Sequence, residues 1–572
     1  MTITSSTPDD THDAVRWEAP GPGTWTLDRT HNVDPLPRFM DGFLAAYGDG
    51  FSEGFRLVGA PLDRIEAATV NGWLYTAVRP LGGRPDGGGP PPRWLMSLLF
   101  RVHPELRRRH ATARRTLAER GWTSTIDDWE RSGRPSTAQL VDRLHPVDLT
   151  TLTDDELGAH VQRCSDVVAG TSRIHFAHAA IVALVSGQLI VLAARHRIAA
   201  SDALAAVTGW SSAVRRPNDL ADAVVDALRA ADALDTLDGE PVTLFDRIRS
   251  VGPAAATTLD AYLREIGPMP AGGISVADAT ILERPELVAT TLRRRIDGSA
   301  GEDDLRAAAD RIAEDLADRI GDPDRAVWRQ AVDDARRVAP VRDQTGALVM
   351  TALGTSRLAL LEVGRRLVAR DWADAPDDAV DLLDREVRAT LSASAGGSKP
   401  GPDAVSAEQL AARVAARRRN ASLPPPDQLG PDSEPPPLDR FPDAIAELSE
   451  AVFAFVSRFE STGDGTDAVT KGLGIGDRPI TGRAVVVHDL TDLDRVGVGD
   501  VLVATTTSPA YNTVLTICGA VVTEVGGSIS HAAIMARELG LSAIVGYPDA
   551  MQIPDGTTVT VDPTTTTVTI GP

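Results

Sequence analysis

Between about residues 94 and 390, apolar positions recur mostly at the spacing of α-helices. Residues 173–197 are apolar nearly all round, which is typical of a helix buried on every side. Further along, one face holds Leu360, Leu361, Gly364, Leu367 and Val368, and the opposite face holds Arg365, Arg366 and Arg370. This pattern predicts a large, mostly α-helical domain over residues 16–390. At its start, two prolines between residues 25 and 37 exclude a helix and predict an ordered loop.

The C-terminal region follows a different pattern, in which short β-branched runs alternate with Gly, Asp and Pro. Such runs are typical of strands separated by turns. The predicted strands are 483–488, 501–504, 520–523, 543–545, 557–561 and 567–570, with helices near 508–517 and 531–539. We therefore expect a small α/β domain over residues 477–572.

Residues 391–476 differ in composition from both domains. Clusters of Gly, Ser and Pro flank an Arg-rich helical stretch, and a second short helix is expected near 441–459. Prolines stiffen a connecting segment, whereas glycines loosen it. The composition predicts a linker with short helices over 391–476, and a disordered tail over residues 1–15.

Net charge and cysteine spacing exclude some classes of binding partner and site. The chain has 58 Lys and Arg against 80 Asp and Glu, a formal net charge of −22, which disfavours electrostatic binding of nucleic acid or of an anionic membrane. Cys164 and Cys518 have no spacing that indicates zinc or a disulfide framework. No 18-residue apolar run and no signal-peptide pattern are evident, so a cytoplasmic protein is expected.

Lysine is nearly absent. Lys399 and Lys471 are the only two, both in Gly-, Ser-, Pro- or Asp-rich stretches. A nucleoside triphosphate site normally combines a lysine with a Gly-rich loop, and Gly-Gly-Ser-Lys399-Pro lacks that spacing. The chain is therefore not expected to bind ATP by itself.

The segment Thr523-Glu-Val-Gly-Gly-Ser-Ile-Ser-His531 carries the clearest chemistry. Gly526 and Gly527 predict a tight turn, Ser530 follows, and His531 opens a short apolar helix. The unpaired N–H groups at a helix start favour anions, and a neutral imidazole is a competent nucleophile. A lone histidine in this place is most often a capping or solvent-exposed residue, but these neighbours point to a phosphohistidine.

The neighbours of His531 belong to a longer ordered pattern. It comprises Gly482-Arg-Ala484, Gly499-Asp-Val-Leu-Val503, residues 523–546, Asp555-Gly556 and Val561-Asp562. With it, the C-terminal region resembles the mobile (swivelling) phosphohistidine domain of the phosphoenolpyruvate-utilising enzymes, among them pyruvate phosphate dikinase, phosphoenolpyruvate synthase and rifampicin phosphotransferase. The resemblance implies that His531 is phosphorylated in transit, within a phosphate loop that includes Thr523, Gly526, Gly527 and Ser530.

Weaker landmarks upstream resemble the antibiotic-binding region of rifampicin phosphotransferase. They are residues 25–35, 71–75, 259–267, 283–288, 341–343 and 357–364. Neither the ATP-grasp domain nor the phosphoenolpyruvate barrel of that family is evident in this sequence. In addition, Thr507-Ser-Pro-Ala-Tyr511-Asn-Thr513 replaces a segment that the family often carries before the histidine helix.

Four residues are candidates on the acceptor side. Arg342 and Arg357 are candidates to meet an incoming phosphate, since guanidinium groups bind phosphoryl oxygens in a bidentate manner; with many arginines in the chain, a solvated surface role is the alternative. His31 is a candidate base for a hydroxyl group, or else a packed loop residue. Asn71 is a candidate whose alternative is a structural role. His175 and His178 lie three residues apart, but without a carboxylate partner we expect no metal site.

Three functions remain open from the sequence. In the first, the chain is a phosphotransferase component: a separate ATP-grasp protein, which binds ATP and Mg²⁺, phosphorylates His531, and the helical domain presents a hydroxyl group of a small molecule, such as a natural product. In the second, that phosphate becomes a leaving group and the net reaction is a dehydration. In the third, the chain is a non-catalytic relative that binds a ligand or a partner protein.

Overall fold

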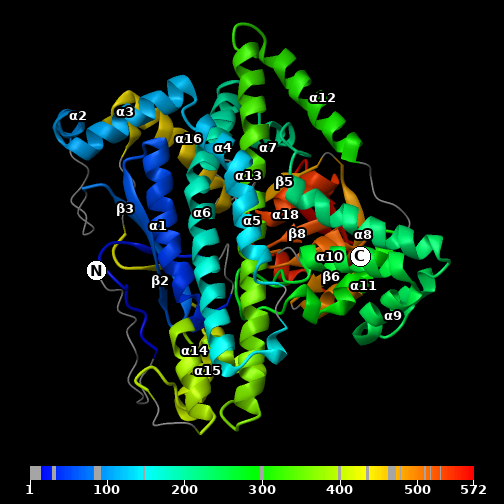
Figure 1. The fold of residues 1–572 in the computed structure, drawn as a ribbon. Coiled ribbons are helices and arrows are strands. Elements are labelled where there is room, and N and C mark those ends of the chain that lie inside the picture. Colours follow the sequence, from blue (N-terminus) through cyan, green and yellow to red (C-terminus); the bar gives the residue numbers. More distant parts are fainter. Residues whose placement is uncertain are drawn as a thin grey trace.

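The computed structural model describes residues 15–28, 34–82, 92–145, 148–296, 302–396, 401–432, 437–460, 472–476, 478–488, 490–507, 511–515, 517–527 and 530–571. Its spine is a pair of long helices that lie side by side, α6 (Asp154–Arg195) and α13 (Arg325–Val368) (Figure 1). A capping box starts α6: the Thr153 hydroxyl accepts from the Glu156 N–H, and the Glu156 carboxylate accepts from the Thr153 N–H at 2.8 Å.

Both spine helices contain an 18-residue window that is long and apolar enough to cross a membrane by length and composition. In α6, 72% of that window is buried inside the protein, and in α13, 78%. The expectation that the chain has no such apolar run was wrong. Other helices cover these apolar windows, and for α6 the apolar pattern of residues 173–197 predicts this burial.

Other helices cover the spine. Against α6 pack α1 (Asp41–Val58) and α16 (Asp443–Glu460), and α3 (Pro104–Glu119) lies against both. Gly187 permits the contact between α6 and α16, because a Cβ there would lie 1.8 Å from the Ala451 carbonyl oxygen. The remaining helices of this part are α2 (Arg93–Val102), α4 (Thr123–Asp128), α5 (Arg134–Asp142), α7 (Ala200–Ala205), α12 (Glu302–Ile320), α14 (Asp384–Ser394) and α15 (Ala407–Ala421).

A four-stranded antiparallel sheet lies on one side of the helices. Its strand order is β2-β3-β1-β4, with β1 at Trp25–Leu27, β2 at Leu62–Val70, β3 at Trp73–Pro80 and β4 at Gln428–Leu429. The stretch predicted as an ordered loop therefore contains strand β1. Proline-based reasoning missed it because β1 ends before Pro35 and is held by its partner strands, which come from elsewhere in the chain.

The prediction of a linker over residues 391–476 needs correction, although its two short helices are present as α15 and α16. Residues 401–432 and 437–460 are built into the helical domain: β4 completes the sheet, the Trp73 Nε1–H donates to the Asn420 carbonyl at 3.2 Å, and α16 buries Ile445, Leu448 and Phe455. Tertiary contacts outweighed the Pro- and Gly-rich composition. Residues 461–471 and 1–14 lie outside the described residues.

The C-terminal sheet has seven strands in the order β11-β10-β6-β7-β8-β9-β5, parallel from β6 to β9 and antiparallel at its edges. The strands are β5 (Leu473–Ile475), β6 (Ile480–Val487), β7 (Val501–Ala504), β8 (Ala520–Thr523), β9 (Ser542–Val545), β10 (Thr558–Asp562) and β11 (Thr567–Ile570), with helices α17 (Asn512–Leu515) and α18 (His531–Leu539). The predicted strands and the helix at 531–539 are confirmed; the short edge strand β5 was missed. The predicted fold class, a large mostly helical part followed by a small α/β domain, is confirmed.

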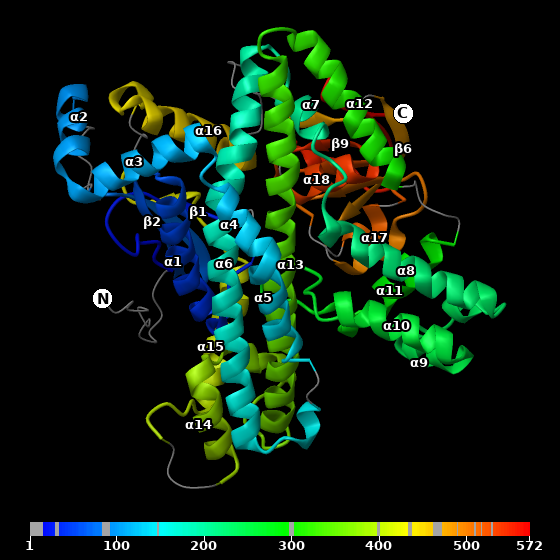
Figure 2. The same cartoon turned by 45° about the horizontal axis from the view of Figure 1, so that its top comes forward.

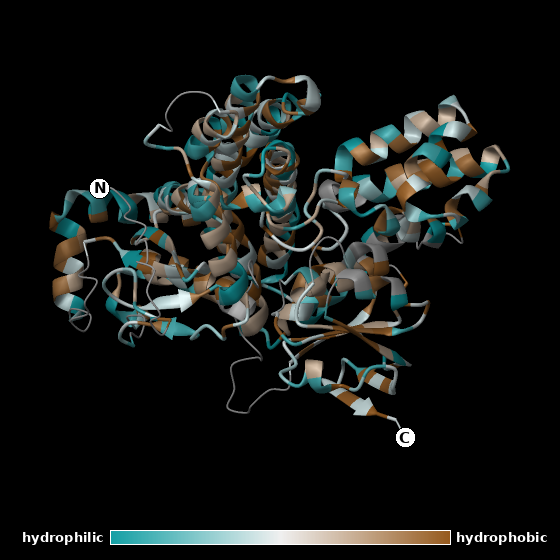
Figure 3. Ribbon diagram, turned by 90° about the horizontal axis from the view of Figure 1, so that it is seen from below, coloured by the Kyte–Doolittle hydropathy of each residue, from teal (hydrophilic) through white to brown (hydrophobic). Residues whose placement is uncertain are grey.

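A small helical lobe packs against this domain. It consists of α8 (Ser212–Ala230), α9 (Leu244–Val251), α10 (Pro253–Ile266) and α11 (Pro285–Arg294), and α11 contacts α17 (Figure 2). Alternate residues of the central strands belong to two apolar clusters, so the sheet is buried on both faces, as its hydrophobic strands in Figure 3 indicate. One of those clusters also contains Val224, Leu259 and Leu292 of the lobe. The C-terminal domain is thus docked on the helical domain.

Candidate functional site

His531 is the first residue of α18 and lies where the C-terminal domain meets the helical domain. Ser530 is the N-cap, and its hydroxyl accepts from the Ala533 N–H at 3.4 Å. Gly526 has a φ of +142°, and a Cβ there would lie 2.9 Å from the Ser530 Oγ. The glycine is therefore needed for the turn that brings the chain into the helix. Gly527 is buried in the same turn.

A threonine that the sequence analysis did not select holds the imidazole. The Thr507 Oγ1 lies 2.8 Å from the Nδ1 of His531, and Thr507 is buried. Thr507 follows β7 and His531 follows β8, and these neighbouring strands are parallel. Their carboxyl ends therefore meet at one edge of the sheet, which is the usual place for a ligand in such folds. The sequence contained a signal for Thr507: it follows a predicted strand, and if that strand is parallel to the one before His531, the two residues lie at the same edge of the sheet.

Thr523, the last residue of β8, lies beneath the same turn. It is fully buried, and among the described residues its Oγ1 has no hydrogen-bond partner. That oxygen is 3.5 Å from the position that a Cβ of Gly526 would take. A buried hydroxyl group without a partner lowers the stability of the fold. The Thr523 hydroxyl is therefore a hydrogen-bonding group directly behind the loop that is able to accept or donate a further bond.

Arg342 of α13 faces His531 from the helical domain. Burial, with the positive charge of Arg342 as the second cause, lowers the pKa of His531 to about 3. The imidazole is therefore neutral at physiological pH in this arrangement. Burial also lowers the pKa of Arg342, against the opposing effect of the neighbouring Asp343. The structure thus brings together two of the predicted residues that are far apart in sequence.

A small cavity of about 90 Å³ lies beside α18, between the two domains. Its lining includes Ser186, Ser211, Arg342, Asp343, Ile534 and Arg537. Pockets that bury a drug-sized ligand measure roughly 300–1,000 Å³. In the docked arrangement this space accommodates a group the size of a phosphate, but not a large acceptor. Arg537, near the end of α18, also lines this cavity.

Asp343 is the acidic group of the cavity. Burial raises the pKa of its carboxyl group, and the positive charge of Arg342 opposes this shift. The loop that carries Ser211 is held by the adjacent Trp210, whose ring lies 4.0 Å from the guanidinium carbon of Arg336. An arginine and a carboxylate therefore stand together on α13 opposite the histidine helix.

The structure places Arg357 elsewhere. Fifteen residues separate it from Arg342 on the same helix, which corresponds to about 22 Å along the axis. Its guanidinium donates to Glu283 through two bonds of 2.8 Å, to Asp377 at 2.7 Å, and to the carbonyls of Val276 and Ala277. Arg357 holds the segment that contains η6 (Ile281–Glu283) against α13, and no donor is left to face His531.

Asn71 is also separate from this interface. Asn71, with a φ of +53°, forms the turn between β2 and β3, and its Nδ2 donates to the Arg16 carbonyl at 2.9 Å. His31 lies outside the described residues. His175 is 2.9 Å from the Thr345 hydroxyl and His178 is 2.8 Å from the Ile174 carbonyl. Among the residues that the structure describes, no group of three or more His, Cys, Asp or Glu could hold a metal ion.

Comparison with known proteins bears on the C-terminal domain first. Residues 496–566 match the family described as "PEP-utilising enzyme, mobile domain". The C-terminal domain therefore resembles the mobile domains of this family. His531, its turn and Thr507 all lie in the matched segment. The general chemistry that this resemblance indicates is phosphoryl transfer.

Curated relatives extend the picture. The chain is 42% identical over 121 residues to a "Probable phosphoenolpyruvate synthase" of Pyrococcus horikoshii, covering 21% of this chain and 14% of the relative. It is 43% identical over 94 residues to "Phosphoenolpyruvate synthase" of Escherichia coli, covering 16% and 12%. "Uncharacterized protein Mb2073c" of Mycobacterium bovis is 28% identical over 422 residues, covering 72% and 43%. The matches thus span less than half of each of these relatives.

Proposed function

We propose that this chain carries a phosphoryl group on His531 and delivers it to a hydroxyl group of a small molecule held by the helical domain. The observation that supports this most is that Arg342 and Asp343 of the helical domain stand opposite the histidine helix. A phosphohistidine domain docked on such a pair is suited to delivering its phosphoryl group. The donor we propose is ATP, bound with Mg²⁺ by an ATP-grasp protein.

The geometry at Thr507 indicates which nitrogen reacts. If the Nδ1–H of His531 donates to the Thr507 hydroxyl, Nε2 keeps its lone pair and is the nucleophile. Nε2 attacks the phosphoryl donor, a P–N bond forms, and the bond from phosphorus to the leaving oxygen breaks. The N–H groups at the start of α18 stabilise the charge of the attached phosphate.

In the second half-reaction, the hydroxyl oxygen of the acceptor attacks phosphorus and the P–N bond breaks. The proton of the hydroxyl passes to the carboxylate of Asp343, whose raised pKa makes it a better base than an exposed aspartate. The guanidinium of Arg342 stabilises the equatorial oxygens of the transferring group. The electron pair of the broken bond returns to Nε2.

The two half-reactions call for two arrangements of the domains. In the docked arrangement His531 faces the helical domain, so charging by another protein requires the C-terminal domain to leave it.

The decisive experiment is phosphorylation of His531. The chain is incubated with labelled ATP, Mg²⁺ and a candidate ATP-grasp protein, and separately with labelled phosphoramidate, which phosphorylates histidine without an enzyme. We expect an acid-labile, alkali-stable label that mass spectrometry maps to His531. His531→Ala removes it, whereas His110→Ala, a change on α3 far from the interface, leaves it in place.

Absence of label on His531 with both donors contradicts the proposal. Analysis of an acceptor then separates two outcomes: a phosphorylated product supports the phosphotransferase. Free phosphate together with an unsaturated product indicates a phosphorylation-dependent dehydration at the same site.

A further inference from the structure

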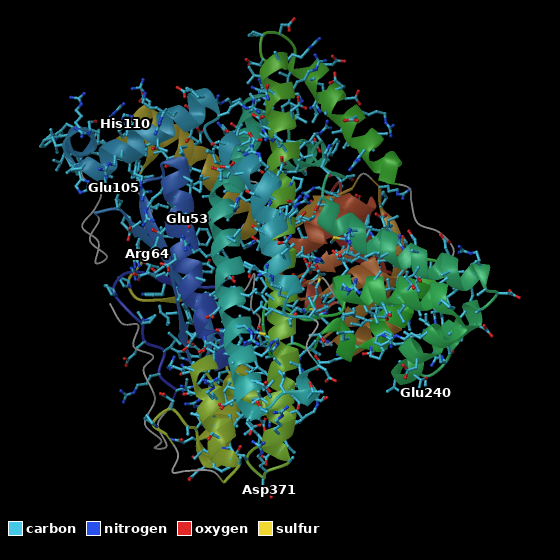
Figure 4. The ribbon with its side chains drawn as sticks, in the orientation of Figure 1. Glu53, Arg64, Glu105, His110, Glu240 and Asp371 are labelled. Carbon is cyan, nitrogen blue, oxygen red and sulfur yellow. The ribbon has the colours of Figure 1, made fainter. Side chains whose placement is uncertain are left out.

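Helices α2 and α3 form a projection at the edge of the helical domain, on the side of the spine opposite the C-terminal domain (Figures 1 and 2). Figure 4 places Glu105 and His110 of α3 at this outer edge. Phe100 of α2 is buried and anchors the helix to the domain. Met96 and Leu99 pack partly against the same core, whereas the face with Trp94, Leu98 and Val102 points away from the domain.

The outward face of α2 is apolar. Trp94, Leu98 and Val102 follow one another at intervals of four residues, which places them along one side of a helix. They are 69%, 45% and 62% exposed. A helix normally turns such a stripe toward the core. Here Phe100 alone is fully buried, and the stripe faces solvent.

The same projection is strongly basic. Residues 93–115 contain seven arginines and one glutamate, a net charge of +6, in a chain whose net charge is −22. Arg109 is buried, where it donates to Glu105 at 2.8 Å and to the Ala60 carbonyl at 2.8 Å. The other six are exposed, and they are Arg93, Arg101, Arg107, Arg108, Arg114 and Arg115.

We propose that this α2–α3 patch, defined by the apolar stripe and the six exposed arginines, binds the surface of an anionic phospholipid bilayer. Tryptophan and leucine on one face of a short helix insert into the boundary between headgroups and acyl chains. Arginines beside them keep their charge at the headgroups while their stems stay apolar. The net charge of the whole chain is −22, so the bilayer attracts the patch and not the chain as a whole, which orients the bound protein with the patch toward the bilayer.

The shape of the patch favours a bilayer over an acidic protein. The patch is a projecting ridge, and a fluid headgroup layer accommodates a ridge, whereas a protein requires a groove of matching form. The bound orientation leaves the C-terminal domain directed away from the membrane (Figure 2). The inference does not depend on phosphoryl transfer.

Flotation of the full chain with vesicles tests the proposal. We expect the chain to float with vesicles that contain phosphatidylglycerol, and not with vesicles of phosphatidylcholine alone, and to be released as salt rises. Trp94→Ser with Leu98→Ser, and separately Arg107→Glu with Arg108→Glu, lower binding by about tenfold or more.

Matched controls share the chemistry but lie elsewhere. Val242→Ser changes an apolar residue that is 81% exposed, and Arg131→Glu with Arg388→Glu changes arginines that are 72% and 60% exposed. These controls keep full binding, and Trp94→Phe retains most of it. All variants change exposed side chains, and unaltered thermal unfolding checks that each is folded.

No flotation with anionic vesicles overturns the proposal, and so does binding that the patch variants do not reduce. A chain that ignores vesicles but binds an acidic protein through the same arginines also overturns it. If the membrane proposal is wrong, the proposed phosphorylation of His531 is not affected, because phosphorylation is measured without lipid.

Discussion

The two halves of α13 use buried arginines in opposite ways. Around Arg357, carboxylates and carbonyls take up the guanidinium donors, and the result is a rigid connection within one domain. Arg342 lies beside the carboxylate of Asp343, and its positive charge helps to lower the pKa of a histidine from another domain. Arg357 thus connects segments within one domain, whereas Arg342 lines a small cavity between two domains.

The largest expected effect concerns Arg357. Arg357→Leu leaves the Glu283 carboxylate without its bidentate partner, and breaking a buried pair in this way costs about 3–5 kcal/mol. Denaturant unfolding of the helical domain measures the loss. The double variant Arg357→Leu with Glu283→Leu should recover much of it. A loss below about 1 kcal/mol would contradict the structural role.

Arg342→Ala should behave in the reverse manner. We expect a smaller loss of the free energy of unfolding than in Arg357→Leu, because Arg342 lines a cavity between the domains and burial already favours the neutral form of the Asp343 carboxyl group, whose pKa is raised. Transfer from phosphorylated His531 to the acceptor should fall by about 10²–10³-fold, the range for loss of a group that stabilises transition-state charge.

Labelling of His531 by phosphoramidate is the internal control for this variant. It should continue, because it does not involve the helical domain. If Arg342→Ala transfers the phosphoryl group from His531 to the acceptor at the wild-type rate, Arg342 does not act in transfer and the proposed difference between Arg342 and Arg357 is wrong.

Acid should weaken the docked arrangement. His531 has a pKa of about 3 when docked and about 6.5 when free. Protonation therefore favours the undocked state, and docking is strongest above about pH 6.5 and weakens as pH falls toward 3. At pH 5 the difference amounts to about 2 kcal/mol.

Small-angle scattering between pH 7 and 5 measures this change as an increase in the radius of gyration. His531→Gln, which cannot titrate, should remove the pH dependence in this range. A curve that is the same for both proteins would show that other groups are responsible.

The smallest effect is expected at Thr507. Thr507→Val keeps the shape of the side chain but loses the contact of 2.8 Å to the Nδ1 of His531. Since the imidazole then lacks a fixed orientation, phosphorylation of His531 should slow by about tenfold, the equivalent of one hydrogen bond. Thr507→Ser should retain most of the rate. Equal rates for the Val and Ser variants would mean that the contact does not position the ring.

The prediction from sequence succeeded where local pattern and burial agree. The strands from β6 to β11 are short β-branched runs between turn residues, and α18 begins at its predicted residue because Ser530 caps it. The apolar pattern of residues 173–197 likewise predicted a buried helix. Over residues 401–432 and 437–460 the sequence correctly predicted two short helices, but prolines and glycines suggested a linker where buried side chains and strand pairing instead join the segment to the helical domain.

The sequence by itself determined that the C-terminal domain is α/β, that His531 starts a helix after a glycine turn, and that the domain resembles those of phosphoryl-transfer enzymes. Each of these depends on residues within a short stretch of chain. Only the tertiary structure decided that Arg342 and Thr507 approach His531 while Arg357 does not. The reason is that two arginines acquire different surroundings only when distant segments of the chain pack together. Those surroundings determine which groups each side chain contacts and how the pKa of a buried group is shifted.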